Sequence, residues 1–316
     1  MTGIRYLDYY LPETHLEATE LLRAIPDLPL PEGYETRDQF IEAFCEERGL
    51  KTIAVETRHS AKQALEVLLE RLFAQGELRP EEVDLLIYGS LGEWGQEGTR
   101  AFELAHCFGM GSPSIFHLFM GCSTGIVAIE TALSHLERHQ MENALILLPS
   151  FLGETNPQKR YLGFSLTGDG AALVHVQRGK ARYRILGSHA SSAGEFAAYG
   201  FGNGVEADFL TILKLGAANI KTLLQKTAMD KAELKQVIPV NTNLGQWKAL
   251  ARLLRVPEKK FLLRFIAEGG HIGSVDLIRG LVELEREENL QKGEKILLYS
   301  QAIGLSFNSM LIEKTA

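Results

Sequence analysis

Cysteine is scarce in this chain: there are three among 316 residues, and no two have the Cys-x-x-Cys spacing. That number and arrangement argue against a disulfide framework and against a structural zinc site. Long hydrophobic runs are also missing, so no segment is long enough to span a bilayer. The first residues, MTGIRYLDYYLPETH, lack the basic and apolar parts of a secretory signal peptide. We therefore expect a cytoplasmic protein.

Basic segments are missing as well. The formal net charge is -7, and no run of Lys and Arg interleaved with aromatic residues occurs. These features exclude the usual classes of nucleic-acid-binding protein. Hydrophobic residues make up 45% and charged residues 23% of the chain, as in an ordinary globular protein that buries a large core.

Short apolar runs alternate with longer amphipathic runs, a pattern typical of an α/β protein with a largely parallel sheet covered by helices. The sequence predicts strands at 83–90, 114–120, 143–150, 171–177, 183–190, 235–242, 295–302 and 309–314. It predicts helices at 37–48, 58–75, 98–108, 123–139, 207–227, 244–254 and 274–289. The two halves, 1–180 and 181–316, each end with a long helix, a polar turn, a buried strand and a closing strand. This order indicates a duplication, and we expect the halves to pack as one body.

Cys122 lies where chemistry is expected. An apolar run at 115–120 leads into Gly-Cys-Ser-Thr-Gly at 121–125, and an amphipathic helical pattern follows at once. The unpaired N–H groups at a helix start favour a thiolate there, and the thiolate is the form that attacks carbonyl carbons. On the residues alone, a cysteine that merely packs remains the competing interpretation. Cys45 and Cys107 lie within helical patterns, and we expect both in the core.

Five segments, in order along the chain, carry a resemblance to a known family. They are YYLPETHLEATELL near the N-terminus, the Cys122 turn, GFSLTGDGAALVHV, VIPVNTNLGQWKALARLLRVP and GGHIGSVDLIRGLVELEREENLQKGEKILLYSQAIG. Together they resemble the thiolase superfamily, closest to its β-ketoacyl-acyl-carrier-protein synthase III branch. The resemblance implies a five-layered αβαβα fold, a homodimer and an acyl-thioester intermediate on Cys122, with no cofactor besides the thioester substrate. It also implies an oxyanion hole made by the backbone N–H groups of Cys122 and of the Ile303–Gly304 turn.

The family's catalytic set of Cys, His and Asn is altered in this chain. The histidine position falls at Val240, whose side chain can neither transfer a proton nor donate a hydrogen bond. The asparagine position falls at His271, so the second position has gained the histidine that the first has lost. The resemblance therefore assigns catalysis to Cys122 and His271, with an amide from Asn241 or Asn243.

Two aspartates accompany these motifs. Asp276 follows His271 by five residues, in the first turns of a predicted helix. It either orients His271 or only places a favourable negative charge at the helix start, and the sequence leaves both interpretations open. Asp169, in the Thr-Gly-Asp-Gly motif, is expected to shape a turn.

Three aromatic residues are candidates for substrate contacts. The family's adenine-binding Trp and Arg correspond to the segment RDQFIEAFCEERGL, where Phe40 replaces the Trp and the Arg is displaced. An acyl carrier protein is therefore as good an expected donor as coenzyme A. Trp94 lies in the segment that usually builds this family's dimer interface. Phe201, followed by Gly202, lies in 189–206, a stretch rich in Gly, Ala and Ser that we expect to form a loop lining the site.

The leading hypothesis is an acyltransferase of fatty-acid-like or secondary metabolism. An acyl group would move from an acyl-coenzyme A or acyl-carrier-protein thioester to Cys122, and then to a small molecule or carrier. The alternative is a condensing enzyme that forms a C–C bond, which needs hydrogen-bond donors converging on an enolate oxygen. The loss of histidine at 240 disfavours it. A third hypothesis is a non-catalytic subunit of a heterodimer, which the retained Cys122 speaks against.

Overall fold

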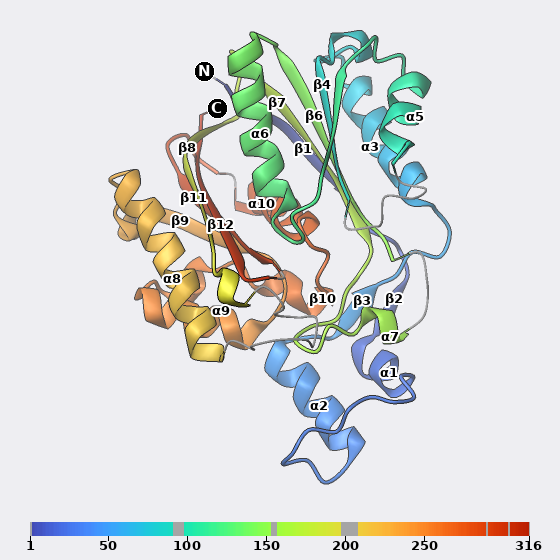
Figure 1. Cartoon of the computed structure of the whole chain (residues 1–316), viewed down its shortest axis with the longest axis vertical. Coiled ribbons are helices and arrows are strands. Elements are labelled where there is room, and N and C mark those ends of the chain that lie inside the picture. The colour runs from blue at the N-terminus through green and yellow to red at the C-terminus, as the bar shows by residue number, and fades with distance from the viewer. Residues whose placement is uncertain are drawn as a thin grey trace.

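The computed structural model describes residues 2–90, 98–152, 157–196, 208–288, 290–302 and 304–315. Figure 1 shows the arrangement of the elements. In chain order they are β1 (Gly3–Tyr10), β2 (His15–Glu17), α1 (Ala18–Arg23), α2 (Arg37–Arg48), β3 (Thr52–Ala54), α3 (Ala61–Ala74), β4 (Leu85–Gly89), α5 (Arg100–Cys107), β5 (Ser114–Leu118), α6 (Thr124–His139), β6 (Asn143–Ser150), α7 (Pro157–Arg160), β7 (Gly170–Gln177), β8 (Tyr183–Ser192), α8 (Phe209–Lys226), β9 (Leu234–Pro239), α9 (Leu244–Leu254), β10 (Glu268–Gly269), α10 (Val275–Glu288), β11 (Lys295–Ala302) and β12 (Ser306–Lys314).

A nine-stranded sheet forms the frame, in the order β5-β4-β6-β7-β1-β8-β12-β11-β9. In the first half β4 pairs in parallel with β6, and β6 pairs antiparallel with β7. In the second half β9 pairs in parallel with β11, and β11 pairs antiparallel with β12. The same local pattern thus occurs on both sides. The two sides join where Gly3 and Ile4 of β1 pair with Tyr183 and Arg184 of β8.

Five layers result from this arrangement. Helices α3 and α5 cover the outer face of the first-half strands, and α8 covers the second-half strands with α9 packed against it. Helices α6 and α10 lie between, where α6 contacts β4, β6 and β12 while α10 contacts β1, β7 and β9. Apolar side chains from both sides meet around these two helices, and a second cluster fills the space under α3 and α5. The expected five-layered αβαβα fold is confirmed.

Local sequence explains where the main helices begin. Ser60 and Gln63 form a reciprocal capping box at the start of α3. The Asp208 side chain accepts from the Thr211 N–H at the start of α8, and Asn243 accepts from the Gln246 N–H at the start of α9. Helix α6 differs because the side chain of its N-cap residue, Ser123, makes no capping hydrogen bond. The N-terminus of α6 is instead completed by residues from another part of the chain.

Two expectations fail. The sequence pattern does not predict β1, although β1 is a central strand paired with both β7 and β8. Cys107 was expected in the core with Cys45, but only Cys45 is buried, and Cys107 is exposed at the end of α5. Burial accordingly raises the pKa of Cys45 to about 11. No helix in the described part of the chain is long and apolar enough to cross a membrane.

The Thr-Gly-Asp-Gly motif connects the nine-stranded sheet, through β7, with a small second sheet of β10, β3 and β2, because the Asp169 N–H donates to the Ala54 carbonyl. Asp169 is buried and paired with the buried Arg160, and its carboxylate also accepts from the backbone N–H groups of Glu56 and Leu152. The expected turn at Asp169 is therefore the centre of a buried network. Gly168 must be glycine because an added Cβ would lie 2.0 Å from the carbonyl oxygen of Gly269.

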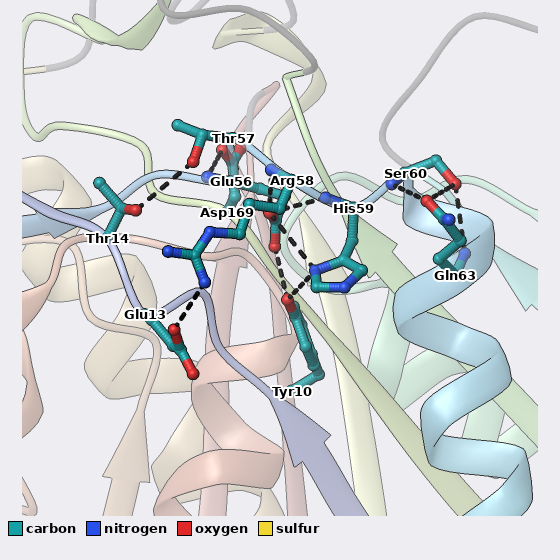
Figure 2. Close-up of polar contacts among 10 residues, drawn as sticks. All are labelled: Tyr10, Glu13, Thr14, Glu56, Thr57, Arg58, His59, Ser60, Gln63 and Asp169. Atoms are coloured by element: carbon teal, nitrogen blue, oxygen red, sulfur yellow. Dashed lines mark hydrogen bonds and ion pairs between the residues drawn. The ribbon is translucent and has the colours of Figure 1, made fainter.

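Figure 2 shows the outer part of this network, between β1 and the start of α3. The Tyr10 hydroxyl donates to Glu56 at 2.6 Å and contacts His59 Nδ1 at 3.0 Å. Glu56 also accepts from the backbone N–H groups of Arg58 and His59. Burial opposes ionisation of Glu56, but these hydrogen bonds outweigh it and lower its pKa. These contacts hold the β3–α3 loop against the end of β1.

Candidate active site

The turn that presents Cys122 follows edge strand β5. Gly121 has a φ of 54°, which turns the chain sharply between the strand and α6. The Thr124 hydroxyl donates to the Gly121 carbonyl at 2.7 Å and accepts from the Met120 N–H at 3.0 Å, so the turn is closed on itself. Cys122 is half-buried. The sequence interpretation of a strand-to-helix turn is confirmed.

His271 reaches Cys122 from the other half of the chain. Its Nε2 lies 3.0 Å from Cys122 Sγ, within hydrogen-bond reach for sulfur. The His271 N–H donates to the Leu166 carbonyl, and the His271 carbonyl accepts from the Gly168 N–H. The imidazole is 2% exposed. A buried ring held by its backbone on both sides has little freedom to leave the sulfur.

Asp276 lies directly behind the imidazole. Its Oδ2 is 2.7 Å from His271 Nδ1, so the three side chains form a Cys122–His271–Asp276 relay. The carboxylate also accepts from the backbone N–H groups of Ile272 and Asn241 and from the Asn241 amide. Of the two interpretations left open by the sequence, the orienting contact is thus present. An aspartate in this place fixes the ring and stabilises its protonated form.

The relay controls the charge of His271. Burial lowers the pKa of the imidazole, but the negative charge on Cys122 and the hydrogen bond and charge of Asp276 outweigh it and raise the pKa to about 10. A protonated His271 can donate from Nε2 to Cys122 Sγ and from Nδ1 to Asp276.

The remaining predicted polar residues lie around the relay rather than in it. Asn241 contacts Asp276, and Asn243 caps α9 with its side-chain oxygen; neither has a hydrogen bond to Cys122 or His271 among the described groups. Val240 is fully buried, with its N–H donated to the Tyr299 carbonyl and its carbonyl occupied by the Trp247 indole. The former histidine position therefore contributes no polar side chain.

The structure describes only two of the three residues predicted to form the oxyanion hole, Cys122 and Gly304. The Cys122 N–H has no acceptor among the described residues, as a group free to meet a substrate oxygen should. Ile303 lies outside the described residues. Gly304 begins the β11–β12 turn with a φ of 75°. Ser300, four residues earlier, contacts the Ser123 hydroxyl at 2.9 Å, which brings this end of β11 to the start of α6.

Of the three predicted substrate-contacting aromatic residues, the structure describes only Phe40. Phe40 is 5% exposed and packs edge-to-face against Tyr34 and Phe44. A ring enclosed in this way offers no open face for an adenine, so the structure does not support Phe40 as a stacking platform. Trp94, Phe201 and the adjoining Gly202 lie outside the described residues.

Space behind the nucleophile turn is minimal. A cavity of about 10 Å³ lies among Gly89, Gly121, Thr124, Ser150 and Ser274, with Leu148, Pro149 and Val275 completing its wall. This volume holds about one water molecule. This cavity is too small for an acyl chain. The described residues contain no group of three or more His, Cys, Asp or Glu placed to bind a metal ion.

Two residues that the structure brings into the site had no firm assignment from the sequence. Asp276 had a visible signal, an aspartate shortly after the candidate histidine, but a helix-start charge accounts for that spacing equally well. Ser274 had no signal. Its hydroxyl contacts Cys122 and Gly125, which are about 150 positions away in the chain.

Comparison with known proteins finds relatives that share this fold and part of this sequence. Residues 224–314 match the family model for the C-terminal part of 3-oxoacyl-[acyl-carrier-protein (ACP)] synthase III. The beta-ketoacyl-[acyl-carrier-protein] synthase III of Aquifex aeolicus (strain VF5) is 23% identical over 274 residues, which cover 83% of this chain and 84% of the Aquifex protein.

Two solved structures share the whole fold. A single-residue variant of OleA from Xanthomonas campestris has a TM-score of 0.83 at 18% identity, with 99% of this chain and 98% of that chain covered. The acyltransferase ChlB3 has a TM-score of 0.81 at 18% identity, with 100% and 98% covered. The C-terminal part of the chain therefore resembles the synthase III family, and the whole chain shares the fold of OleA and ChlB3.

Proposed function

We propose that this protein is an acyltransferase that moves an acyl group from a thioester donor through Cys122 to a nucleophilic acceptor. The observation that carries the proposal is the Cys122–His271–Asp276 relay, with contacts of 3.0 and 2.7 Å. The relay supplies a nucleophile and a proton carrier, which are the groups that acyl transfer needs. The chemistry calls on no cofactor besides the thioester.

The first step loads the cysteine. The Cys122 thiolate attacks the thioester carbonyl, and the Cys122 N–H stabilises the oxyanion of the tetrahedral intermediate. When the intermediate collapses, the C–S bond to the donor breaks, and His271 Nε2 gives its proton to the departing thiolate. The products are an acyl-Cys122 thioester, a free donor thiol and a neutral imidazole.

The second step uses the change in charge that the first step makes. Acylation removes the negative charge of Cys122, which is the largest contribution raising the pKa of His271. The neutral imidazole can then take a proton from an alcohol, amine or thiol acceptor as that acceptor attacks the acyl group. Cys122 leaves as the thiolate, and the resting ion pair is restored. Histidine therefore becomes a base only once the enzyme is loaded.

Decarboxylative condensation makes a different demand. An enolate forms on the malonyl thioester, and its oxygen needs at least two converging hydrogen-bond donors. Val240 offers none, and Asn241 and Asn243 are engaged with Asp276 and with the α9 cap. These observations support acyl transfer over condensation. The relatives carry both kinds of name, since one is a synthase III and another an acyltransferase.

Intact-protein mass spectrometry tests the proposal. The full chain is incubated with a panel of acyl-coenzyme A and acyl-carrier-protein donors, and we expect a mass gain equal to the acyl group with at least one of them. Addition of alcohol, amine and thiol acceptors should discharge it. If malonyl-carrier protein instead discharges the loaded enzyme with release of CO2, the protein is a condensing enzyme. If no donor loads it, the non-catalytic subunit becomes the better account.

Carrier-protein docking has support from one surface. Helices α8 and α9 pack together, and neither contains an Asp or Glu in a chain of net charge -7. Their cationic residues are Lys214, Lys221, Lys226, Lys248 and Arg252. Helix α9 starts shortly after Asn241, whose amide contacts Asp276, so the N-terminal end of α9 lies near the site; Arg252, at its other end, is paired with Glu258. An acidic carrier would be attracted there.

The double substitution Lys214→Glu/Lys248→Glu should therefore raise the KM for carrier-borne donors roughly ten-fold at low salt. The KM for coenzyme A donors should change far less, because a small donor is held mainly inside the site. Steady-state kinetics with one acyl group on both carriers measures the difference. Lys180→Glu is the matched control. Lys180 is an exposed lysine just after the C-terminal end of β7, so it belongs to neither α8 nor α9. Equal effects on both donors would contradict carrier docking at α8 and α9.

The proposed assembly is a homodimer. Strand β5 is the edge of the nine-stranded sheet, and all five of its residues are half-exposed. Phe119 and Met120, which follow it, are 65% and 42% exposed in the single chain. An unpaired edge next to exposed apolar side chains favours pairing with a second copy. Trp94, in the segment that follows β4, is the residue that we propose reaches the partner's site.

A further inference from the structure

Ser274 connects the two halves of the chain at the reacting pair. Its hydroxyl donates to the Cys122 carbonyl at 3.0 Å and accepts from the Gly125 N–H at 2.8 Å. Cys122 and Gly125 belong to the turn at the start of α6, whereas Ser274 belongs to the turn that leads into α10. The side chain is buried, with 6% of its surface exposed. The Ser274 hydroxyl is therefore both a donor and an acceptor toward the turn that carries Cys122.

The contact replaces the helix cap that α6 lacks. The first N–H groups of a helix have no partner within it, and the Ser123 side chain does not supply one. Ser274 satisfies the Gly125 N–H from outside the helix. The approach is close because Gly125 has no side chain: an added Cβ would lie 2.9 Å from the Ser274 Cβ. The turn and the loop thus touch at one defined position.

The same loop carries His271. His271 and Ser274 lie within one short turn, and the His271 backbone is held at both its N–H and its carbonyl. A hydroxyl that fixes Cys122 to this loop consequently fixes the separation between Cys122 Sγ and His271 Nε2. Without it, nothing else among the described contacts joins the Cys122 backbone directly to the histidine loop.

We propose that Ser274 is a positioning residue that holds the Cys122 thiol against His271 and so maintains the thiolate–imidazolium pair. The proposal deepens the acyl-transfer function, because this pair is the starting state of that reaction. Its test nevertheless needs no acyl donor. Alkylation of the resting enzyme reports how much thiolate Cys122 carries at each pH.

The experiment compares iodoacetamide alkylation rates of Cys122 from about pH 5 to 10 in a Cys107→Ala background. Cys45 is buried, so this background leaves Cys122 as the accessible thiol. Ser274→Ala is expected to slow alkylation near pH 6 about ten-fold, and to move the midpoint of the profile toward about pH 8.5, the value of an ordinary thiol. At the alkaline end both proteins should react at similar rates.

Two further variants separate positioning from stability. Ser309→Ala removes another buried hydroxyl, which donates to Asn219 at 2.7 Å between β12 and α8, and it should lower the melting temperature while leaving the alkylation profile unchanged. Gly125→Ala keeps the Ser274 hydroxyl but pushes turn and loop apart, so it should shift the profile in the same direction as Ser274→Ala. It also serves if Ser274→Ala fails to fold.

A wild-type alkylation profile in Ser274→Ala, with only a lower melting temperature, would overturn the proposal and leave Ser274 a stabilising residue. The result is also distinguishable from a failure of the acyl-transfer function. If the wild-type chain accepts no acyl group from any donor, acyl transfer is wrong, while the alkylation profiles still decide the role of Ser274.

Discussion

Replacing Cys122 with alanine is expected to lower acyl transfer by on the order of 10⁴-fold or more, because the substitution removes the sulfur on which we propose that the acyl-enzyme forms. Cys122 is half-buried with its Sγ 3.0 Å from His271 Nε2, and no other cysteine has such a partner among the described groups. Intact-protein mass spectrometry should show no acyl adduct on the variant with a donor that loads the wild type. Product formation should fall to the rate without enzyme.

Cys107→Ala is the matched control for this loss. Cys107 is the more exposed thiol, and it lies at the end of α5 without a histidine contact in the described part of the chain. If exposure alone governed acylation, this variant would lose the adduct and Cys122→Ala would keep it. That outcome, or an adduct of full size on Cys122→Ala, would contradict the assignment of the nucleophile.

The fold was predictable where burial is uniform or strictly periodic. Strand β6 is a run of eight residues that are all buried, and α6 buries one face. Both therefore stand out in the sequence as an unbroken apolar run and a helical pattern. Strand β1 does not, because GIRYLDYY mixes Arg, Asp and Tyr with apolar residues. It is a strand because β7 and β8, which lie far away in the chain, pair with it on both sides.

The candidate site, like the fold, was predictable only where neighbours in the chain determine it. The glycine turn before α6 is local, so the position of Cys122 followed from its neighbours in the chain. The partnership of Asp276 with His271 is also local, but a favourable charge at a helix start explains the same spacing. Only the position of the imidazole between sulfur and carboxylate distinguishes the two. Ser274 and Gly125 are 149 positions apart, and no periodicity connects them.

The enclosed Phe40 illustrates a further limit. The correspondence of its segment to an adenine-binding motif concerns order along the chain, whereas adenine stacking depends on which face of α2 is open. In this protein that face packs into the core with Tyr34 and Phe44. Sequence correspondence can therefore locate a segment without fixing which of its side chains meet a ligand.

His271→Ala is expected to slow both steps, and the second more than the first. Loading should fall roughly 10²- to 10⁴-fold near neutral pH, because Cys122 loses the imidazole that contacts its sulfur and carries the proton of the reaction. Raising the pH toward about 10 should restore part of the loading, since an isolated thiol ionises there without help. Transfer to an alcohol acceptor should not recover, because no base remains to take the acceptor's proton.

Pre-loaded enzyme makes the two steps separable. The His271→Ala variant is loaded at high pH, returned to neutral pH and mixed with acceptor, and the decay of the acyl adduct is followed by intact mass. Asp276→Asn should also slow both steps, because the amide NH2 cannot accept from the N–H groups that the carboxylate meets and the charge that favours the protonated ring is lost. His139→Ala, an exposed histidine in the last turn of α6, is the control and should behave as wild type. If loaded His271→Ala discharges at the wild-type rate, the base lies elsewhere and the Cys122–His271–Asp276 relay serves loading alone.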